Sequence, residues 1–293
     1  AKANTGKNRT AVGQVVSGKN SSKFSVVQKA PSVVLKSSDV PDYEKYYLPD
    51  DSGLGIPKTK EAILSSDSRW SFVRSKQSEH FIVFWDKQYG EYGLYGKQVG
   101  EADSWPTTEA NAAMRVDIDD LLKKAEQFFD TNVNVLKMAE LGVGKSYLDK
   151  YKMQIYLIWQ DEWLATGSGY GNTIGALWVN PSTCQPVGST IAHEIGHSFQ
   201  YQVYCDKIAQ GGTDDLKSGF RYGFIKSSNP GSSGGNAYWE QCAQWQSFQD
   251  YPAQILGGYD INVWLANYHR HFHHEWMRYA SYYFQYYLTA KHG

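Results

Sequence analysis

The run from His193 to His197, which reads His-Glu-Ile-Gly-His, constrains this chain more than any other feature. In a helix, His193 and His197 lie on one face, about one turn apart. Two imidazoles in that arrangement can bind one metal ion, and this pattern is typical of zinc. Glu194 lies beside them and can act as a general base on a water molecule. The alternative is an ordinary helix with two surface histidines.

The residues around this run favour a helix. A Pro-Gly turn at residues 186–188 precedes it, and Ser189 and Thr190 are suited to capping. No helix breaker follows as far as Tyr204. We therefore expect a helix that begins near Ser189, in which Gly196 lets another segment approach closely.

A third ligand is needed, and Glu240 is the best candidate. The segment from Tyr238 to Trp245 is predicted to be helical, and small Ala243 lies one turn beyond Glu240. That spacing would allow close packing against the first helix. The alternative is a surface glutamate on an amphipathic helix.

The hydrophobic pattern indicates an α+β chain of 293 residues. Residues 1–40 are rich in Ser, Lys, Asn and Gly, which predicts a flexible arm or linker. Residues 41–293 are expected to form one domain with lobes at 41–200 and 201–293. The expected elements are strands at 70–74, 81–85, 152–159 and 175–179, a glycine-rich turn at 167–172, a long helix from Met114 towards Gly142, and a helix at 276–288.

Composition excludes two classes of function. The net charge of −1 gives no basic field for nucleic acid. No apolar run reaches membrane-spanning length, so no membrane span is expected. The three cysteines exclude a disulfide-dense framework; one Cys184–Cys205 bridge and buried free thiols both remain open.

The His-Glu-x-x-His run, followed by a glutamate in the Trp-Glu-x-x-Ala setting of Trp239 to Ala243, resembles the gluzincin clan of zinc metallopeptidases. More closely, the chain resembles secreted zincin-like proteins of unknown function from Bacteroidetes. The shared features are residues 79–85, 193–201 and 239–245 and the Tyr-rich C-terminal segment at 276–288.

This resemblance implies a zincin-like catalytic domain. Its N-terminal lobe would hold a mixed sheet, a long helix and the active-site helix, and its C-terminal lobe would be mainly helical. It implies His193, His197 and Glu240 as Zn²⁺ ligands and Glu194 as general base. It also implies an edge strand along which substrate lies, which we expect at Gly175, Ala176, Leu177 and Trp178. No residue matches the clan's usual transition-state Tyr or His.

Four of the eight histidines lie between His269 and His274. One member, for which we favour His271, would stabilise the oxyanion of the reaction; Tyr279 could do so instead by donating its phenol proton. The segment could also hold a second metal, or be a His-rich surface turn.

The sequence therefore predicts a zinc metallopeptidase, most readily an endopeptidase acting on a protein or glycoprotein. The alternatives are a zinc-dependent glycan-processing enzyme and a non-catalytic carbohydrate- or protein-binding module with a structural zinc. We expect a secreted, periplasmic or cell-surface protein, with further domains beyond this sequence.

Overall fold

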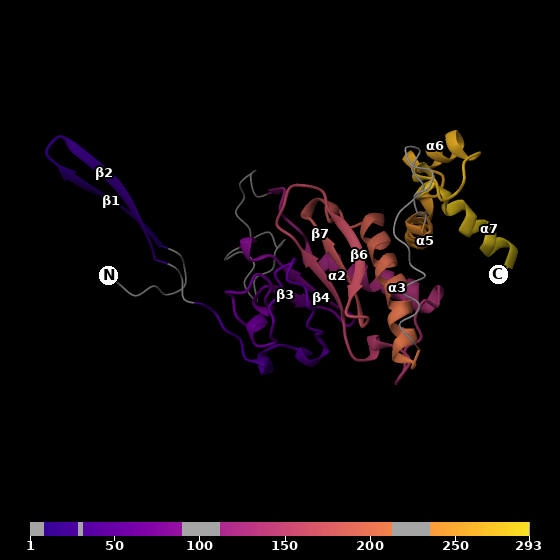
Figure 1. The fold of residues 1–293 in the computed structure, drawn as a ribbon, viewed down its shortest axis with the longest axis horizontal. Helices are drawn as coiled ribbons and strands as arrows, with labels where there is room; N and C mark the ends of the chain where they lie inside the picture. Colours follow the sequence, from indigo (N-terminus) through magenta and orange to yellow (C-terminus); the bar gives the residue numbers. More distant parts are fainter. Residues whose placement is uncertain (1–8, 29–31, 90–111, 213–234, 293) are drawn as a thin grey trace.

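A mixed five-stranded sheet forms the centre of the protein (Figure 1). The computed structural model describes residues 9–28, 32–89, 112–212 and 235–292. The strand order is β3 (Ser75–Gln77), β4 (Phe81–Trp85), β5 (Met153–Leu157), β7 (Ile174–Val179) and β6 (Ala165–Tyr170). The inner strands β4, β5 and β7 are parallel, and β3 and β6 run antiparallel to their neighbours. The sheet therefore ends at β6, whose outer edge has no strand partner among the described residues.

The two faces of the sheet bury different cores. Phe81, Val83 and Trp85 belong to the core beneath the helices α2 (Ile118–Asp130) and α3 (Ser189–Ala209). Ile82 and Phe84 belong to a second core, which residues 40–72 cover. Alternate side chains of a strand point to opposite faces, so β4 is apolar throughout because both faces are covered.

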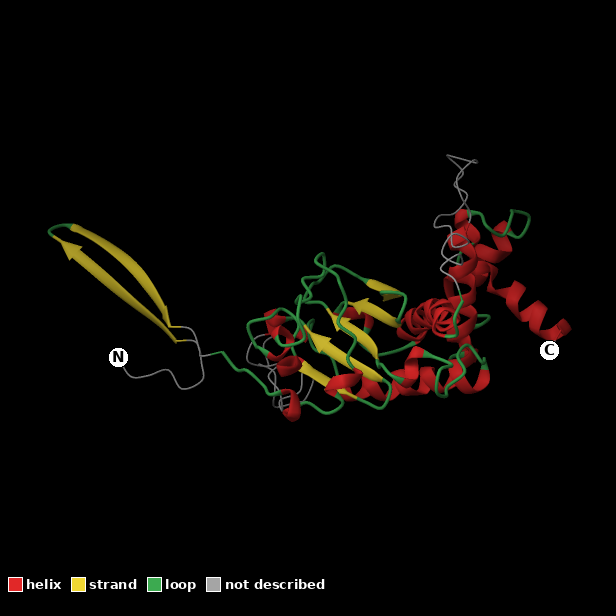
Figure 2. Cartoon of the chain, turned by 60° about the horizontal axis from the view of Figure 1, so that its bottom comes forward, coloured by secondary structure: helices red, strands yellow, loops and turns green. Residues whose placement is uncertain are grey.

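The remaining helices gather toward the C-terminal end (Figure 2). They are α5 (Gly235–Asp250), α6 (Gly258–Asn267) and α7 (Tyr283–His292). The result is an α+β fold in which α3 lies between the sheet and the C-terminal helices (Figure 1). None of the described helices is long and apolar enough to cross a membrane.

The N-terminal region contains a hairpin that the sequence analysis did not anticipate. Strands β1 (Arg9–Ser17) and β2 (Asn20–Gln28) pair antiparallel over their whole length. Both views show the hairpin standing away from the sheet and the helices (Figures 1 and 2).

Several expected elements are confirmed, including the strands at β4, β5 and β7 and the helices at α2, α3 and α5. Others are wrong. Residues 72–74 form a 3₁₀ turn and not a strand, and α2 ends at Asp130 in a π-helical turn, well before Gly142. The C-terminal segment is broken into two 3₁₀ turns before α7 begins.

The glycine-rich stretch 167–172 is also not a simple turn, because its first four residues belong to β6. A Cβ atom on Gly167 would lie 2.0 Å from the backbone oxygen of Glu194. Glycine is needed there because the strand passes directly over α3.

All three cysteines are free thiols, and Cys184 and Cys205 are buried. The Cys184–Cys205 bridge that the sequence left open is therefore not formed.

Candidate metal centre

Helices α3 and α5 pack closely at the position of Gly196. A Cβ atom on Gly196 would lie 3.3 Å from the Gln246 side chain and 3.4 Å from the Cα atom of Ala243. The absence of a side chain at Gly196 and the small one at Ala243 thus let the two helices approach, as the sequence predicts. This contact brings Glu240, one turn before Ala243, opposite the two histidines of α3.

The side chains of His193, His197 and Glu240 converge on one point. The Nε2 atoms of His193 and His197 lie 3.0 and 3.1 Å from the same carboxylate oxygen, Oε2 of Glu240. The three potential ligand atoms lie within 4.8 Å of one another, and no other such group of three occurs among the described residues. Two nitrogens and a carboxylate oxygen form a donor set that suits zinc.

A glutamine side-chain amide also contacts the second ring nitrogen, Nδ1, of each imidazole. Nδ1 of His193 lies 2.8 Å from Oε1 of Gln244, whose Nε2 donates to Asp260 at 2.9 Å. Nδ1 of His197 lies 3.1 Å from Oε1 of Gln200. Such outer contacts fix the ring orientation and the tautomer of metal-binding histidines.

This arrangement fits a bound cation. Both ring nitrogens of each histidine face an oxygen atom, yet a neutral imidazole carries only one N–H. If the Nδ1–H groups donate to the glutamines, the two Nε2 lone pairs point at the Glu240 carboxylate. A metal ion among these atoms would turn that repulsion into coordination.

The pKa values of His193 and Glu240 also fit a bound cation. Burial lowers the pKa of His193, but contacts with Glu240, Glu194 and Gln244 outweigh it and raise the pKa above the ordinary value. Burial raises the pKa of Glu240, yet the two imidazoles against its carboxylate, in their protonated forms, hold that pKa far below the usual range. Negative charge is thus concentrated where a cation would bind.

Glu194 and Tyr279 also lie at this site. Glu194 is buried and lines the cleft beside the triad, and no described residue forms a hydrogen bond or ion pair with its carboxylate. The rings of Tyr279 and His193 are 5.9 Å apart. Burial and the Glu240 charge raise the pKa of Tyr279 to about 12, so its phenol stays protonated at neutral pH.

A cleft of 590 Å³ opens over the group. One wall is strand β6, and the other comes from α5 and from Tyr279. Apart from the triad and Glu194, the described side chains that line it are neutral. They are Trp163, Ala165, Thr166, Ser168, Ser189, Thr190, Trp239, Gln244 and Tyr279.

The structure corrects the expected position of the edge strand. Strand β7, which holds Gly175 to Trp178, lies between β5 and β6, so it is not an edge. The backbone N–H of Gly175 donates to Gln202, and the carbonyl of Ala176 accepts from Ser198, both on α3. Gly175, Ala176, Leu177 and Trp178 are absent from the cleft lining, where β6 takes their place.

The histidine-rich segment does not reach the cleft. His271 is exposed, and its Nδ1 accepts from the backbone N–H of His273. His274 caps a 3₁₀ turn by accepting from the backbone of Trp276. Of the two expected oxyanion helpers, only Tyr279 lies at the site, and these histidines form no group of potential metal ligands.

The sequence analysis missed the residues that support the ligands. Gln244 follows Glu240 by four positions and Gln200 follows His197 by three, so helical spacing could have identified both. Thr166, Ser168 and Trp163 were missed because nothing in the sequence predicted strand β6. Ser189 and Thr190 line the cleft and do not cap α3, whose N-cap is Gly188.

The chain belongs to a family of unknown function, DUF6055, whose model matches residues 39–293. The match leaves out the hairpin of β1 and β2. No curated protein and no solved structure matches the chain.

Proposed function

We propose that the protein is a zinc metallopeptidase. The observation that carries the proposal is the convergence of His193, His197 and Glu240 on one point, with Glu194 beside them in an open cleft. A purely structural zinc site is closed by four protein ligands, whereas three ligands beside a cleft leave a position open. The cleft therefore supports catalysis over a structural role.

In this proposal His193, His197 and Glu240 hold a zinc ion, which supplies a Lewis acid that polarises a carbonyl and acidifies water. Glu194 takes a proton from the attacking water and passes it to the leaving nitrogen. Its carboxylate is suited to this because no described residue engages it. Tyr279, protonated at neutral pH, donates a hydrogen bond to the developing oxyanion.

The substrate proposed is a protein or glycoprotein. The outer edge of β6, which has no strand partner in the described part of the chain, supports an extended peptide, because a peptide can pair with the backbone of an open strand. Outside the metal group and Glu194, the described side chains that line the cleft are neutral, which favours uncharged substrate segments. Its place in the cell is proposed to be secreted, periplasmic or cell-surface.

A second candidate is a zinc-dependent enzyme that processes glycans. Trp163 at the cleft is 64% exposed, and Trp239 also lines the cleft. Exposed indole rings in a cleft bind sugar rings as readily as apolar peptide side chains.

The proposal is tested with two variants and a mixed panel of proteins, glycoproteins and polysaccharides. Glu194→Gln is expected to retain zinc and lose hydrolysis, and His193→Ala to lose zinc. Mass spectrometry of the products separates peptide cleavage from glycan cleavage. Full activity in Glu194→Gln would refute the mechanism, and normal zinc content in His193→Ala would refute its role as a ligand.

A further inference from the structure

The Gln244 side chain joins His193 to a residue outside the triad. Oε1 of Gln244 lies 2.8 Å from Nδ1 of His193, and Nε2 of Gln244 donates to Oδ2 of Asp260 at 2.9 Å. Asp260 lies in the first turn of α6, whereas Gln244 belongs to α5. Asp260 is not among the described residues that line the cleft. The hydrogen-bonded route from Asp260 to the metal centre therefore runs through the Gln244 amide.

The Asp260 end sets the direction of these two hydrogen bonds. An amide side chain has a donor and an acceptor, so Gln244 by itself can present either one to His193. A neutral imidazole carries one N–H, which can lie on either ring nitrogen. An ionised carboxylate, in contrast, can only accept. Asp260 therefore attracts the amide nitrogen of Gln244 and turns the amide oxygen toward Nδ1 of His193, which must then carry the proton.

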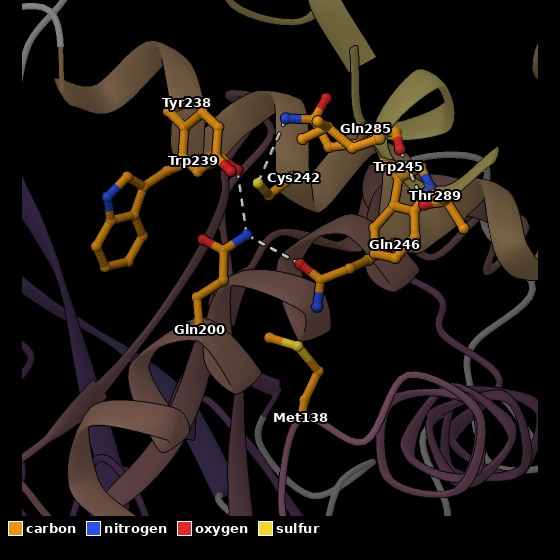
Figure 3. A pocket seen from close by; sticks show the side chains of 10 residues that line it. Met138, Gln200, Tyr238, Trp239, Cys242, Trp245, Gln246, Gln285 and Thr289 are labelled. Atoms are coloured by element: carbon orange, nitrogen blue, oxygen red, sulfur yellow. Dashed lines mark hydrogen bonds between the residues drawn. The ribbon is translucent and has the colours of Figure 1, made fainter. Parts of the chain in front are cut away.

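The second histidine shows the same order of groups with a different terminus. Nδ1 of His197 lies 3.1 Å from Oε1 of Gln200, and Nε2 of Gln200 donates to the Trp239 carbonyl at 3.1 Å. Figure 3 shows that this nitrogen also faces Oε1 of Gln246, at 2.9 Å. A backbone carbonyl, like a carboxylate, can only accept. Both histidines thus face an amide oxygen whose orientation is imposed by an acceptor farther from the metal centre.

We propose that Asp260 is a positioning residue, which keeps the proton of His193 on Nδ1 and leaves the Nε2 lone pair for the metal. Zinc binds the unprotonated ring nitrogen, so the other tautomer would present an N–H where the metal should lie. At His197 the main chain supplies the orienting acceptor. At His193 the acceptor is the Asp260 side chain, which a substitution can remove. The effect on zinc rests on the proposed zinc site, whereas the tautomer of His193 can be measured without metal.

The first test is zinc affinity, measured by competition with a chromophoric chelator at neutral pH. Asp260→Leu is expected to bind zinc about tenfold more weakly, as loss of an outer contact of a metal ligand does. Asp260→Asn should bind zinc nearly as the parent does, because its side-chain oxygen can still accept from Gln244. In a Gln244→Leu background, Asp260→Leu should cause no further loss, since it acts through that amide.

The second test determines the tautomer of His193 in zinc-free protein. It uses a Glu240→Ala background, which removes the carboxylate that competes for a proton on Nε2. Nitrogen NMR of isotope-labelled histidine at about pH 9, where imidazoles are neutral, distinguishes the two tautomers. His193 is expected to carry its proton on Nδ1, and to become a mixture of tautomers when Asp260→Leu is added. His197 is the internal control and should keep its Nδ1 proton in both proteins.

Urea unfolding first establishes that each variant folds. Asp260→Ala replaces the leucine variant if that one does not fold, because a water molecule in the vacated space can donate as well as accept and imposes no direction.

Three zinc results would overturn the inference: unchanged affinity in Asp260→Leu, an equal loss in Asp260→Asn, or additive losses in the double variant. An equal loss in Asp260→Asn would mean that the charge of the carboxylate matters and not its role as acceptor. An unchanged His193 tautomer after Asp260→Leu would also overturn it. A parent protein that binds no zinc refutes the proposed function, and the tautomer measurement then decides this inference alone.

Discussion

Replacing Gln244 by leucine tests how the outer contacts hold the metal centre. The change removes the oxygen that lies 2.8 Å from Nδ1 of His193, while the imidazole itself remains. His193 is 7% exposed, so water cannot readily replace that partner. Loss of one partner of a buried hydrogen bond costs about 1–3 kcal/mol, and such outer contacts alter metal affinity by about 10–100-fold. Zinc should therefore bind about 10–100-fold more weakly.

The assay is competition for zinc with a chromophoric chelator at neutral pH. Gln249→Leu is the matched control, because Gln249 lies on the same helix and its amide donates to the Trp245 carbonyl, away from the triad. The control should bind zinc as the parent does. A Gln244→Leu protein that folds normally and binds zinc within twofold of the parent would refute the reasoning.

Three further predictions concern catalysis, packing and acid stability. Tyr279→Phe should keep zinc and lower kcat by about 10²–10³-fold, measured on the substrate found in the panel; unchanged kcat would exclude it as oxyanion donor. Gly196→Val should destabilise the protein by about 1–3 kcal/mol in urea unfolding, because α5 leaves no room for the side chain; unchanged stability would contradict the close packing. Burial raises the pKa of Glu126, but the hydrogen bonds from the backbone and the imidazole of His80 outweigh it and lower the pKa below 4.5. Its stabilisation is thus present above pH 4.5 and lost as pH falls through the lowered value. Glu126→Gln should flatten this acid loss in urea unfolding against pH, and an equally steep loss would contradict the assignment.

The local part of the candidate metal site could be predicted from the sequence. The spacing of His193 and His197 determines their common face once the segment is helical, because helix geometry is a local property. The helical setting of Glu240 allowed it to be predicted as a candidate third ligand. Its approach to the histidines could not be derived, because the contact joins residues more than forty positions apart and depends on how α3 and α5 pack.

Strand β6, which forms one wall of the cleft, could not be predicted, because its glycines are required by tertiary contacts with α3. Gly167 and Gly169 indicated a turn by composition, whereas the strand uses glycine where it crosses α3. A Cβ atom on Gly169 would lie 2.1 Å from the ring of Tyr201, more than thirty residues away. Sequence also carried no signal for the order of the strands, so β7 was expected at the edge that β6 occupies.

For the histidine-rich segment, by contrast, the sequence predicted a functional residue that the structure places outside the cleft. The density of His269 to His274 suggested chemistry, but local backbone geometry accounts for the contacts of His271 and His274. Composition alone does not say which way side chains point, whereas the i, i+4 spacing of the triad histidines does.

The central claim is that His193, His197 and Glu240 hold one zinc ion. Elemental analysis of protein purified without chelators, beside a Glu240→Ala variant, tests it most directly. The structure predicts about one zinc per chain in the parent and its loss in the variant, since three ligands are the usual protein set of a catalytic site. A folded parent that contains no zinc and takes up none, or a variant that keeps the full amount, would contradict the claim.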